Sequence, residues 1–467
     1  MIERDLAGEV LAATLAGGGG FSELFAERTT PTLLRLDGGR LEEAACGVDM
    51  GVGLSLVEGE RTLYASGNRL DRDTLLAMAD RLVKARAAQG APAAAAPGGP
   101  VRFREEPLAL VSPVSVPPRG VPMPRKVEVL RRADAAARGF DKRVSQVTAW
   151  YKDTEQEVLI ANSAGRWARE TRQHITMYVT AVARDGADIR TGSESRSETR
   201  GFEFFEIHPP EETAREAARL AVLQLGARPA PAGRFMVVLS SSAGGTMVHE
   251  ACGHGLEADF IRKSLSAYAG RLGQKVASEL ISVVDDGTLP WLRGSSSVDD
   301  EGTATTRAVL IERGVLKGFL HSRLTAQAME AAPTGHGRRE SYRHLPLPRM
   351  RNTMILPGST PPEKILSSVR NGILIRRMGG GEVDVTSGNF VFSCAEAYMI
   401  RDGRVAEPIR DATLIGNGPE VLSAIDMVGS DLGYGVGTCG KEGQGVPVTD
   451  AQPTLRIPSI TVGGVAT

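Results

Sequence analysis

The H-E-x-x-x-H segment at residues 249–254 constrains this chain more than any other stretch. It places His249, Glu250 and His254 directly after a run of small residues at positions 240–245. Imidazole nitrogen is a common ligand for zinc and related divalent ions, and a glutamate beside the first ligand can take a proton from an attacking water. The segment therefore predicts a metal-dependent hydrolase.

The spacing of the two histidines restricts the local backbone. Histidines four residues apart lie only ~40° apart around an α-helix, whereas a five-residue separation splays them by ~140°. His249 and His254 can share one ion only if the helix widens into a π-type turn or if His254 lies beyond its end. Gly253 and Gly255 permit either distortion at low steric cost. The alternative is a regular helix with one histidine in the core and the other in solvent.

A third ligand is expected from elsewhere in the chain, because a catalytic zinc usually has three protein ligands and one open position. The best candidate is Cys439, in the glycine-rich segment 435–445, where the backbone can approach an ion closely and Lys441 would favour the thiolate. The alternative for Cys439 is an inert, buried cysteine in a turn. The other cysteines are predicted to be core residues: Cys46, Cys252 and Cys394.

Three further polar residues are candidates for the surroundings of the site. Glu257 and Asp259 follow the second histidine and either accept the other ring N–H of a ligating imidazole or are solvated acids at a helix end. His336 lies in the polar segment 335–344, which either lines the site or is a solvated loop.

The length of 467 residues exceeds what one core usually serves, so two domains are expected. Residues 226–233, rich in proline and small residues, are the predicted linker between domains 1–225 and 234–467. The Ala/Pro/Gly run at 88–100 predicts a flexible loop. We expect an α+β fold, in which an N-terminal α/β layer domain with antiparallel strands precedes a strand-rich catalytic domain carrying the metal-binding helix.

Hydrophobic periodicity supports this class. The predicted N-terminal helices are residues 2–15, 73–88, 124–139 and 211–224, and the strands are 33–36, 53–57, 61–65, 144–151, 155–162 and 171–183. The C-terminal strands are expected at 235–239, 280–284, 308–312, 315–320, 372–376, 382–386, 390–394, 397–401, 412–415 and 455–457, with short helices at 324–331, 361–369 and 419–424.

Composition narrows the environment and the partners. The net charge is −1, without a basic block, so neither a nucleic acid nor an anionic membrane is expected as a partner. The acidic start lacks the features of a signal peptide, and no window holds ~18 uninterrupted apolar residues. The four scattered cysteines do not form a disulfide framework. A reducing, cytoplasmic setting is the expectation.

Several separate motifs, in the same order, resemble the TldD/PmbA family, once described as modulators of DNA gyrase. The three main motifs are residues 249–259, 437–444 with 446–448, and 452–455 with 461–464. Shorter similar segments lie at 300–303, 348–353 and 412–416. The resemblance is dense from about residue 235 onward and sparse before it.

The resemblance implies a metallopeptidase that holds one zinc ion per active subunit through His249, His254 and Cys439, with Glu250 as general base. It also implies a two-domain subunit and a dimer enclosing a channel that admits only small or unfolded peptides. One branch of the family keeps H-E-x-x-x-H and its partner branch lacks it, so this chain resembles the active, TldD-type subunit. Such a subunit pairs with itself or with a PmbA/TldE-type subunit that lacks the motif.

Two other functions compete with peptide hydrolysis. One is a non-catalytic scaffold that binds peptides or a partner such as gyrase and holds a structural metal. A structural zinc should have four protein ligands, and only three converge by these arguments. The other is an amidase or related hydrolase that acts on modified small molecules.

Overall fold

One long antiparallel sheet organises the N-terminal half of the molecule. The computed structural model describes all residues except 17, 90–100, 106–107, 110 and 465–467. The sheet has eight strands in the order β4-β3-β1-β6-β7-β5, with β2 added to β1 and β8 to β7. Its strands are β1 (Phe21–Asp37), β2 (Arg40–Cys46), β3 (Asp49–Glu58), β4 (Arg61–Gly67), β5 (Arg104–Glu105), β6 (Val144–Asn162), β7 (Arg166–Asp185) and β8 (Asp188–Glu198).

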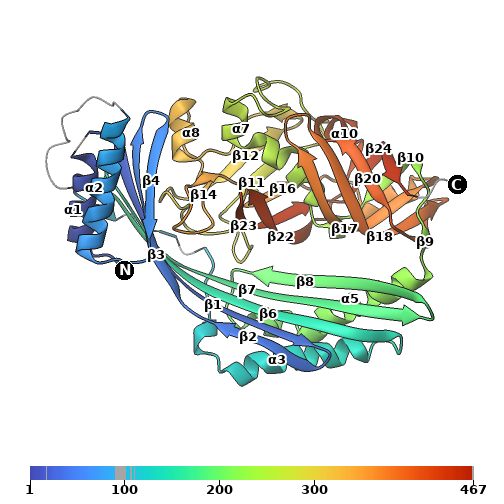
Figure 1. The fold of residues 1–467 in the computed structure, drawn as a ribbon. Helices are drawn as coiled ribbons and strands as arrows, with labels where there is room; N and C mark the ends of the chain where they lie inside the picture. The colour runs from blue at the N-terminus through green and yellow to red at the C-terminus, as the bar shows by residue number, and fades with distance from the viewer. Residues whose placement is uncertain (17, 90–100, 106–107, 110, 465–467) are drawn as a thin grey trace.

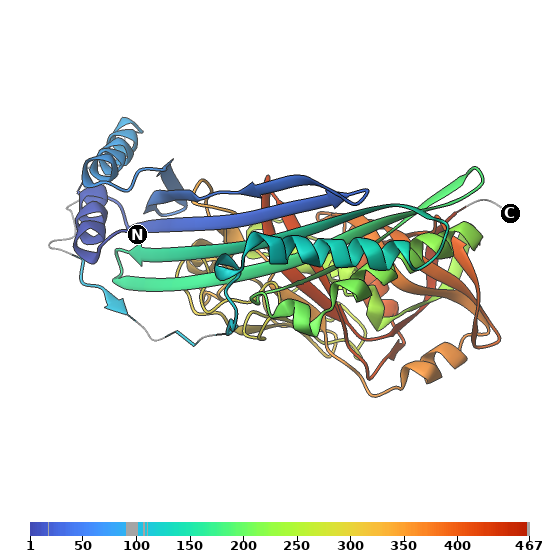
Figure 2. The same ribbon diagram turned by 90° about the horizontal axis from the view of Figure 1, so that it is seen from below.

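Four helices cover one face of this sheet because alternate side chains of a strand point to opposite faces. Leu24 of β1 packs in a core with α1 (Arg4–Leu15) and α2 (Arg72–Ala88), and Leu34 packs in a second core with α3 (Met123–Arg138) and α5 (Pro210–Gly226). Phe25 points the other way and meets Val298 and Tyr342 of the C-terminal half. Figures 1 and 2 show α3 and α5 on the outer face, with the C-terminal half on the inner face.

The predicted N-terminal helices are confirmed, and Asp71 caps α2 by accepting a hydrogen bond from the backbone of Thr74. The two strands predicted at 144–151 and 155–162 form the single strand β6, because residues 148–162 pair continuously with β1. The loop predicted at 88–100 falls mostly on residues 90–100, outside the described residues.

The C-terminal half contains two sheets. In the first, five strands pair in the closed ring β17-β10-β24-β20-β18, because β17 also pairs with β18. These strands are β10 (Gly233–Leu239), β17 (Asn371–Asp384), β18 (Asn389–Arg401), β20 (Thr413–Asn417) and β24 (Leu455–Gly463). Three further strands extend this sheet: β9 (Arg228–Pro229), β19 (Arg404–Arg410) and β21 (Met427–Val428).

The second sheet has six strands in the order β13-β12-β11-β16-β23-β22, so β22 is an edge strand. Its strands are β11 (Val283–Asp286), β12 (Arg307–Glu312), β13 (Val315–Leu316), β16 (Asn352–Ile355), β22 (Gly433–Lys441) and β23 (Gln444–Gln452). A two-stranded sheet joins β14 (Gly337–Arg338) to β15 (Leu347–Pro348).

The remaining helices are short: α4 (Phe204–Ile207), α6 (Thr246–Val248), α7 (Ala258–Arg262), α8 (Arg323–Ala328), α9 (Pro362–Ser367) and α10 (Gly418–Ala424). The α+β class is therefore confirmed. The domain boundaries stay a prediction; within the expected linker, Arg228–Pro229 forms β9 and pairs with β19. Among the described residues, no helix is both long and apolar enough to cross a membrane.

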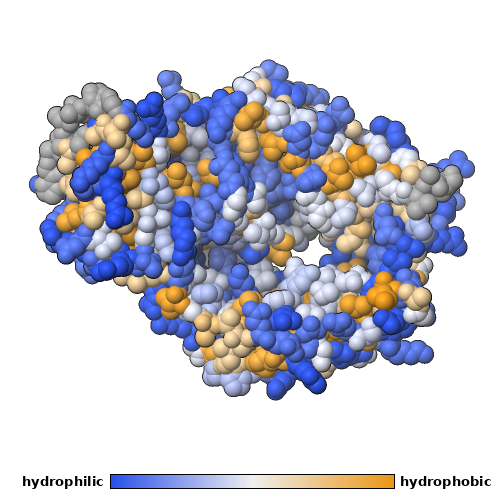
Figure 3. All heavy atoms as spheres, in the orientation of Figure 1, coloured by the Kyte–Doolittle hydropathy of each residue, from blue (hydrophilic) through white to orange (hydrophobic). Residues whose placement is uncertain are grey.

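Buried ion pairs join the inner face of the N-terminal sheet to the C-terminal half. Arg339 Nη2 lies 2.8 Å from Glu23 Oε1, and Arg172 Nη1 lies 2.6 Å from Asp300 Oδ1. Away from these contacts the two parts separate, and Figure 3 shows the molecule hollowed between them.

Candidate metal centre

Two glycines let the segment after β10 pack against the β22–β23 hairpin. Gly244 and Gly245 have φ angles of +77° and +82°, which favour glycine. A side chain at Gly244 would collide with Gly435 of β22, and one at Gly245 would collide with Ala451 of β23. The small residues that precede the motif therefore bring its helix against the strand that carries Cys439.

The widening predicted from the histidine spacing is confirmed. Residues His249–Gly253 form a π-helix, and His254 begins the 3₁₀ turn that follows it. The carbonyl of Ala251 lies within this turn and accepts a hydrogen bond from Tyr268 Oη at 2.8 Å. A side chain at Gly253 would collide with the thioether of Met350. The ring centroids of the two histidines lie 5.0 Å apart.

The structure brings His249, His254 and Cys439 together. One ligand atom from each lies within 4.8 Å of the others, and all three residues are buried. Cys439 Sγ lies 3.5 Å from Nε2 of His254, although 185 residues separate them in the chain. Two imidazoles and a thiolate are soft-to-borderline donors, so the residues fit a divalent metal ion that prefers nitrogen and sulfur.

Each imidazole is oriented by a carboxylate. Nδ1 of His249 lies 2.8 Å from Asp450 Oδ1, and Nδ1 of His254 lies 3.1 Å from Glu257 Oε2. These contacts occupy Nδ1 and leave Nε2 of each ring for an ion. Asp450 is not among the residues predicted from the sequence. Its side chain lies on the face of β23 shared by Val446, which pairs with Cys439, so only the strand register identifies it.

A buried lysine links the two acids after the second histidine. Lys441 Nζ lies 2.9 Å from Glu257 Oε2 and 2.7 Å from Asp259 Oδ1. Burial raises the pKa of Glu257, but Lys441 and His254 outweigh burial and lower the pKa to about 2. Glu257 is fully buried rather than a solvated helix-end acid, whereas Asp259 contacts Lys441 and neither histidine.

Contact between thiol and imidazoles sets the charge state of the ligands. Burial raises the pKa of Cys439, but His249 and His254 outweigh burial and lower the pKa to about 5. Burial lowers the pKa of His254, but Glu257 and Cys439 raise it to about 10. The pKa of His249 is likewise raised well above its usual range, mainly by Asp450 acting against burial. The two histidines, and not Lys441 as the sequence suggested, favour the thiolate.

Metal affinity is expected to rise with pH across the neutral range. The raised pKa of His254 keeps both ring nitrogens protonated at neutral pH. An ion must displace the proton on Nε2 before that nitrogen can bind the ion. Each displaced proton makes the apparent affinity fall about tenfold per pH unit below the pKa. Competition for Zn²⁺ with a chromophoric chelator between pH 6 and 8.5 measures this slope. A flat profile would contradict the proposed proton displacement.

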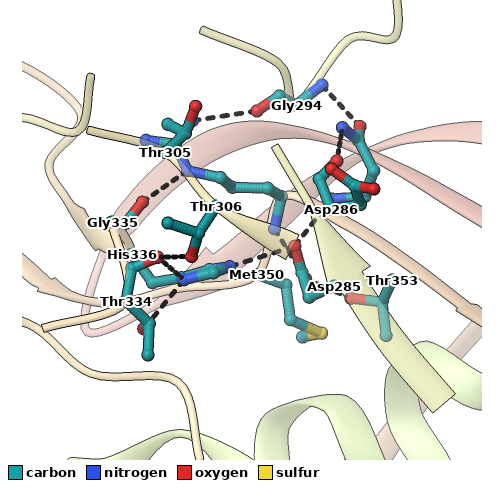
Figure 4. Close-up of polar contacts among 12 residues, drawn as sticks. Asp285, Asp286, Gly294, Thr305, Thr306, Thr334, Gly335, His336, Met350 and Thr353 are labelled. Carbon is teal, nitrogen blue, oxygen red and sulfur yellow. Dashed lines mark hydrogen bonds and ion pairs between the residues drawn. The ribbon is translucent and has the colours of Figure 1, made fainter. Parts of the chain in front are cut away.

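The third candidate for the surroundings of the site, His336, lies elsewhere. His336 is fully buried, so its interpretation as a solvated loop residue is wrong. Its Nε2 lies 3.1 Å from Asp285 Oδ1, and its Nδ1 lies 2.9 Å from the carbonyl of Thr334 (Figure 4). Asp285 also accepts a hydrogen bond from Thr353 Oγ1. His336 therefore holds the segment before β14 against β11 and is not part of the group formed by His249, His254 and Cys439.

The other cysteines lie outside the group formed by His249, His254 and Cys439. Cys252 and Cys394 are buried, as predicted, and Cys252 Sγ contacts the carbonyl of Val248 at 3.4 Å. Cys46, in contrast, is exposed, so its prediction as a core residue is wrong. It is the last residue of β2, which in the described part of the chain pairs with β1 alone and is exposed along nearly its whole length.

Glu250 lies beside the ligands with its carboxylate unengaged. It is partly buried and makes no side-chain hydrogen bond or ion pair within the described part of the chain. Burial raises the pKa of Glu250, although His249 and His254 act in the opposite direction. A carboxylate that is unpaired, close to the ligands and more basic than usual is suited to accept a proton.

Replacing Asp450 by asparagine is expected to weaken metal binding about 10- to 100-fold, because the ring of His249 loses the charged acceptor that orients it. Competition for Zn²⁺ measures the change. Asp259→Asn is the matched control, since Asp259 lies near the site without touching a histidine. Equal losses in both variants would contradict a specific role for Asp450.

Family models match most of the chain. The PmbA/TldA metallopeptidase domain 1 matches residues 22–86, the central domain matches 116–225 and the C-terminal domain matches 232–464. The chain is 38% identical to the metalloprotease TldD homologue of Haemophilus influenzae, over 95% of this chain and 93% of that protein. It is 40% identical to a metalloprotease of Methanothermobacter thermautotrophicus, over 75% of this chain and 76% of that protein.

Two solved structures share the fold. A Thermotoga maritima protein described as a candidate modulator of a DNA gyrase superposes with a TM-score of 0.78 at 24% identity, covering 95% of this chain and 96% of that one. TldE from Thermococcus kodakarensis superposes with a TM-score of 0.76 at 19% identity, covering 98% and 100%. Ligand cluster, fold and family matches together define a metallopeptidase. The chain belongs to the PmbA/TldD family, and its curated relatives include proteins named TldD.

Proposed function

We propose that this chain is a zinc-dependent peptidase in which Glu250 is the general base. The observation that carries the proposal is the convergence of His249, His254 and Cys439 within 4.8 Å, beside an unpaired glutamate. Three protein ligands leave the fourth zinc position open, as catalytic zinc sites require, whereas a structural zinc takes four. The open position therefore favours catalysis over the scaffold alternative.

The residues divide the work between positioning and proton transfer. When bound, zinc acts as a Lewis acid that lowers the pKa of water and polarises a carbonyl. Glu250 accepts the proton of the attacking water and then delivers it to the leaving amine. Asp450 and Glu257 hold the two imidazoles in the tautomer that presents Nε2 to the ion.

The edge strand β22 suggests how a peptide is held. It carries Cys439 and has a strand partner on one side only, β23. An extended peptide can pair with its free edge through main-chain hydrogen bonds, which give affinity with little sequence preference. Small or unfolded peptides suit this mode because their backbone groups are free to pair, whereas most backbone groups of a folded protein are already hydrogen-bonded within its own secondary structure.

The assembly that we propose is a dimer enclosing a channel, formed either by two copies of this chain or with a PmbA/TldE-type subunit. The similarity in fold to TldE supports such a partner. We propose a cytoplasmic location, with neither a membrane nor a nucleic acid as a direct partner. The net charge of −1 is consistent with this interpretation.

Incubation with a mixed pool of unstructured peptides tests the proposed function. Mass spectrometry measures the fragments. We expect cleavage to stop when a chelator is added and to resume when Zn²⁺ is added. A folded protein added to the same reaction should remain intact. Binding without cleavage by the zinc-loaded protein would favour the scaffold alternative. Cleavage of modified small amides, but of no peptide, would favour an amidase.

A further inference from the structure

A cavity of about 430 Å³ lies between the N-terminal sheet and the β22–β23 hairpin. Lys152 of β6 and His174 of β7 contribute to its wall from the sheet, and Thr438 and Pro447 contribute from the hairpin. We call it the arginine cavity, because Arg293 and Arg338 also line it. Thr438 precedes Cys439, so the two side chains point to opposite faces of β22. The cavity therefore lies on the face of the hairpin opposite the metal ligands.

Three cations of the arginine cavity have no carboxylate partner among the described residues. Lys152, Arg293 and Arg338 form no ion pair with any carboxylate in the described ranges. Four other cations line the wall. Arg172 pairs with Asp300, Arg339 with Glu23, and Arg343 with Asp49, whereas Arg351 donates to the carbonyls of Gly335 and Gly294. The wall also carries the acids Glu27, Asp49, Asp300 and Glu340, so its seven basic side chains outnumber its four carboxylates.

Three buried side-chain nitrogen atoms of this wall have no hydrogen-bond partner among the described residues. They are Nε of Arg293, Nε of Arg339 and Nδ1 of His174. Burial alone lowers the pKa of Arg293 to about 10, which means that no nearby carboxylate compensates its charge. Burial, followed by repulsion from Arg293 and Arg172, lowers the pKa of His174 to about 3. His174 is therefore a neutral ring among cations, able to donate one hydrogen bond.

A purely structural role does not account for these charges. Arg338 is only 7% exposed and donates to the carbonyls of Met350 and Pro447, and Arg293 donates to the carbonyl of Gly437. A neutral amide could satisfy the same carbonyls without the cost of desolvating an unpaired charge. Arginine at both positions is explained if an anion enters the cavity.

We propose that the arginine cavity binds a carboxylate group of the peptide substrate, a proposal that rests on the peptidase function above. Successive residues of an extended peptide paired with the edge of β22 point alternately to the two faces of the hairpin. When one residue presents its carbonyl on the face of Cys439, its neighbour projects toward the face of Thr438. Arg293 lies there, with Nη1 3.3 Å from Thr438 Oγ1.

The carboxylate has two possible sources, the peptide C terminus and an acidic side chain. The test uses four forms of one unstructured peptide, with a free or amidated C terminus and with Glu or Gln at one position. Binding is measured by calorimetry to the zinc-loaded Glu250→Gln protein, which holds peptide without cleaving it. We expect the form that carries the recognised carboxylate to bind about 10- to 100-fold more tightly than its neutral counterpart. Weaker binding after amidation identifies the C terminus as the source, and weaker binding after replacement of Glu by Gln identifies the side chain.

Charge-removing variants assign the preference to the cavity. In the same background, Lys152→Gln and Arg293→Gln should each remove most of the preference and leave binding of the neutral peptide unchanged. Lys152 is exposed and makes no side-chain hydrogen bond or ion pair in the described residues, so Lys152→Gln tests the proposal even if Arg293→Gln fails to fold. Arg343→Gln is the matched control, because this cation at the rim is already paired with Asp49 and should retain the preference.

Two results would overturn the proposal: equal binding of all four peptides, or a preference that survives both Lys152→Gln and Arg293→Gln. Neither depends on turnover, so the two proposals fail separately. Cleavage of neutral and acidic peptides with equal kcat/KM would support the peptidase function and contradict the carboxylate site. Binding with the expected preference but without cleavage would support the carboxylate site and contradict the peptidase function.

Discussion

Glu250→Gln protein is expected to retain its zinc and to lose peptide hydrolysis by a factor of about 10²–10⁴ in kcat. Glutamine keeps the size and polarity of the side chain but cannot accept a proton. Glu250 makes no side-chain hydrogen bond or ion pair in the described residues, so its replacement by glutamine is expected to leave the arrangement of His249, His254 and Cys439 intact. Steady-state kinetics on one cleaved peptide, together with metal analysis of the same sample, measure both quantities.

The matched control is Glu363→Gln, which changes an exposed glutamate of α9 and should alter neither quantity. Full activity in Glu250→Gln would refute the base assignment. Loss of zinc together with activity would instead make Glu250 a ligand or a structural support.

Local pattern was sufficient to predict that His249 and His254 face one point, because both lie in one short segment, whereas Cys439 was left open by its own neighbours and was joined to them only by the family resemblance. The five-residue interval between His249 and His254 cannot serve one ion on a regular helix, and the flanking glycines permit the π-helix that forms. Asp450 could not be predicted in this way. Its contact with His249 depends on the register of β22 against β23, which no short sequence pattern specifies.

The fold was predictable where buried positions recur with a regular period along the chain, as in the N-terminal helices and in β6. The strand β8 was missed because Ser, Thr, Arg and Glu dominate it, and its exposed and buried positions differ little in polarity. The β22–β23 hairpin was missed because glycine and proline usually weaken strands. Glycine is required there by the close approach of Gly244 to Gly435. Tertiary contact thus overrides local preference at the site itself.

Cys439→Ala protein is expected to lose zinc binding by more than the 10- to 100-fold expected of Asp450→Asn, and to lose activity with it. The thiolate is a ligand candidate and also the counter-charge for two buried imidazoles, since contact with both histidines lowers its pKa to about 5. Without it, an ion would keep only two protein ligands. Zinc content after dialysis and competition with a chelator measure the loss.

Cys252→Ala provides the matched control, because Cys252 is an equally buried cysteine within the same motif. Burial raises the pKa of Cys252 to about 12, so its thiol stays neutral, and it packs in the core and donates to the carbonyl of Val248. This variant should keep its zinc, and circular dichroism of both variants separates metal loss from unfolding. Unchanged zinc stoichiometry in folded Cys439→Ala would remove Cys439 from the site. Only the two histidines would then remain as candidate ligands, and the argument that three protein ligands leave one position open would fail.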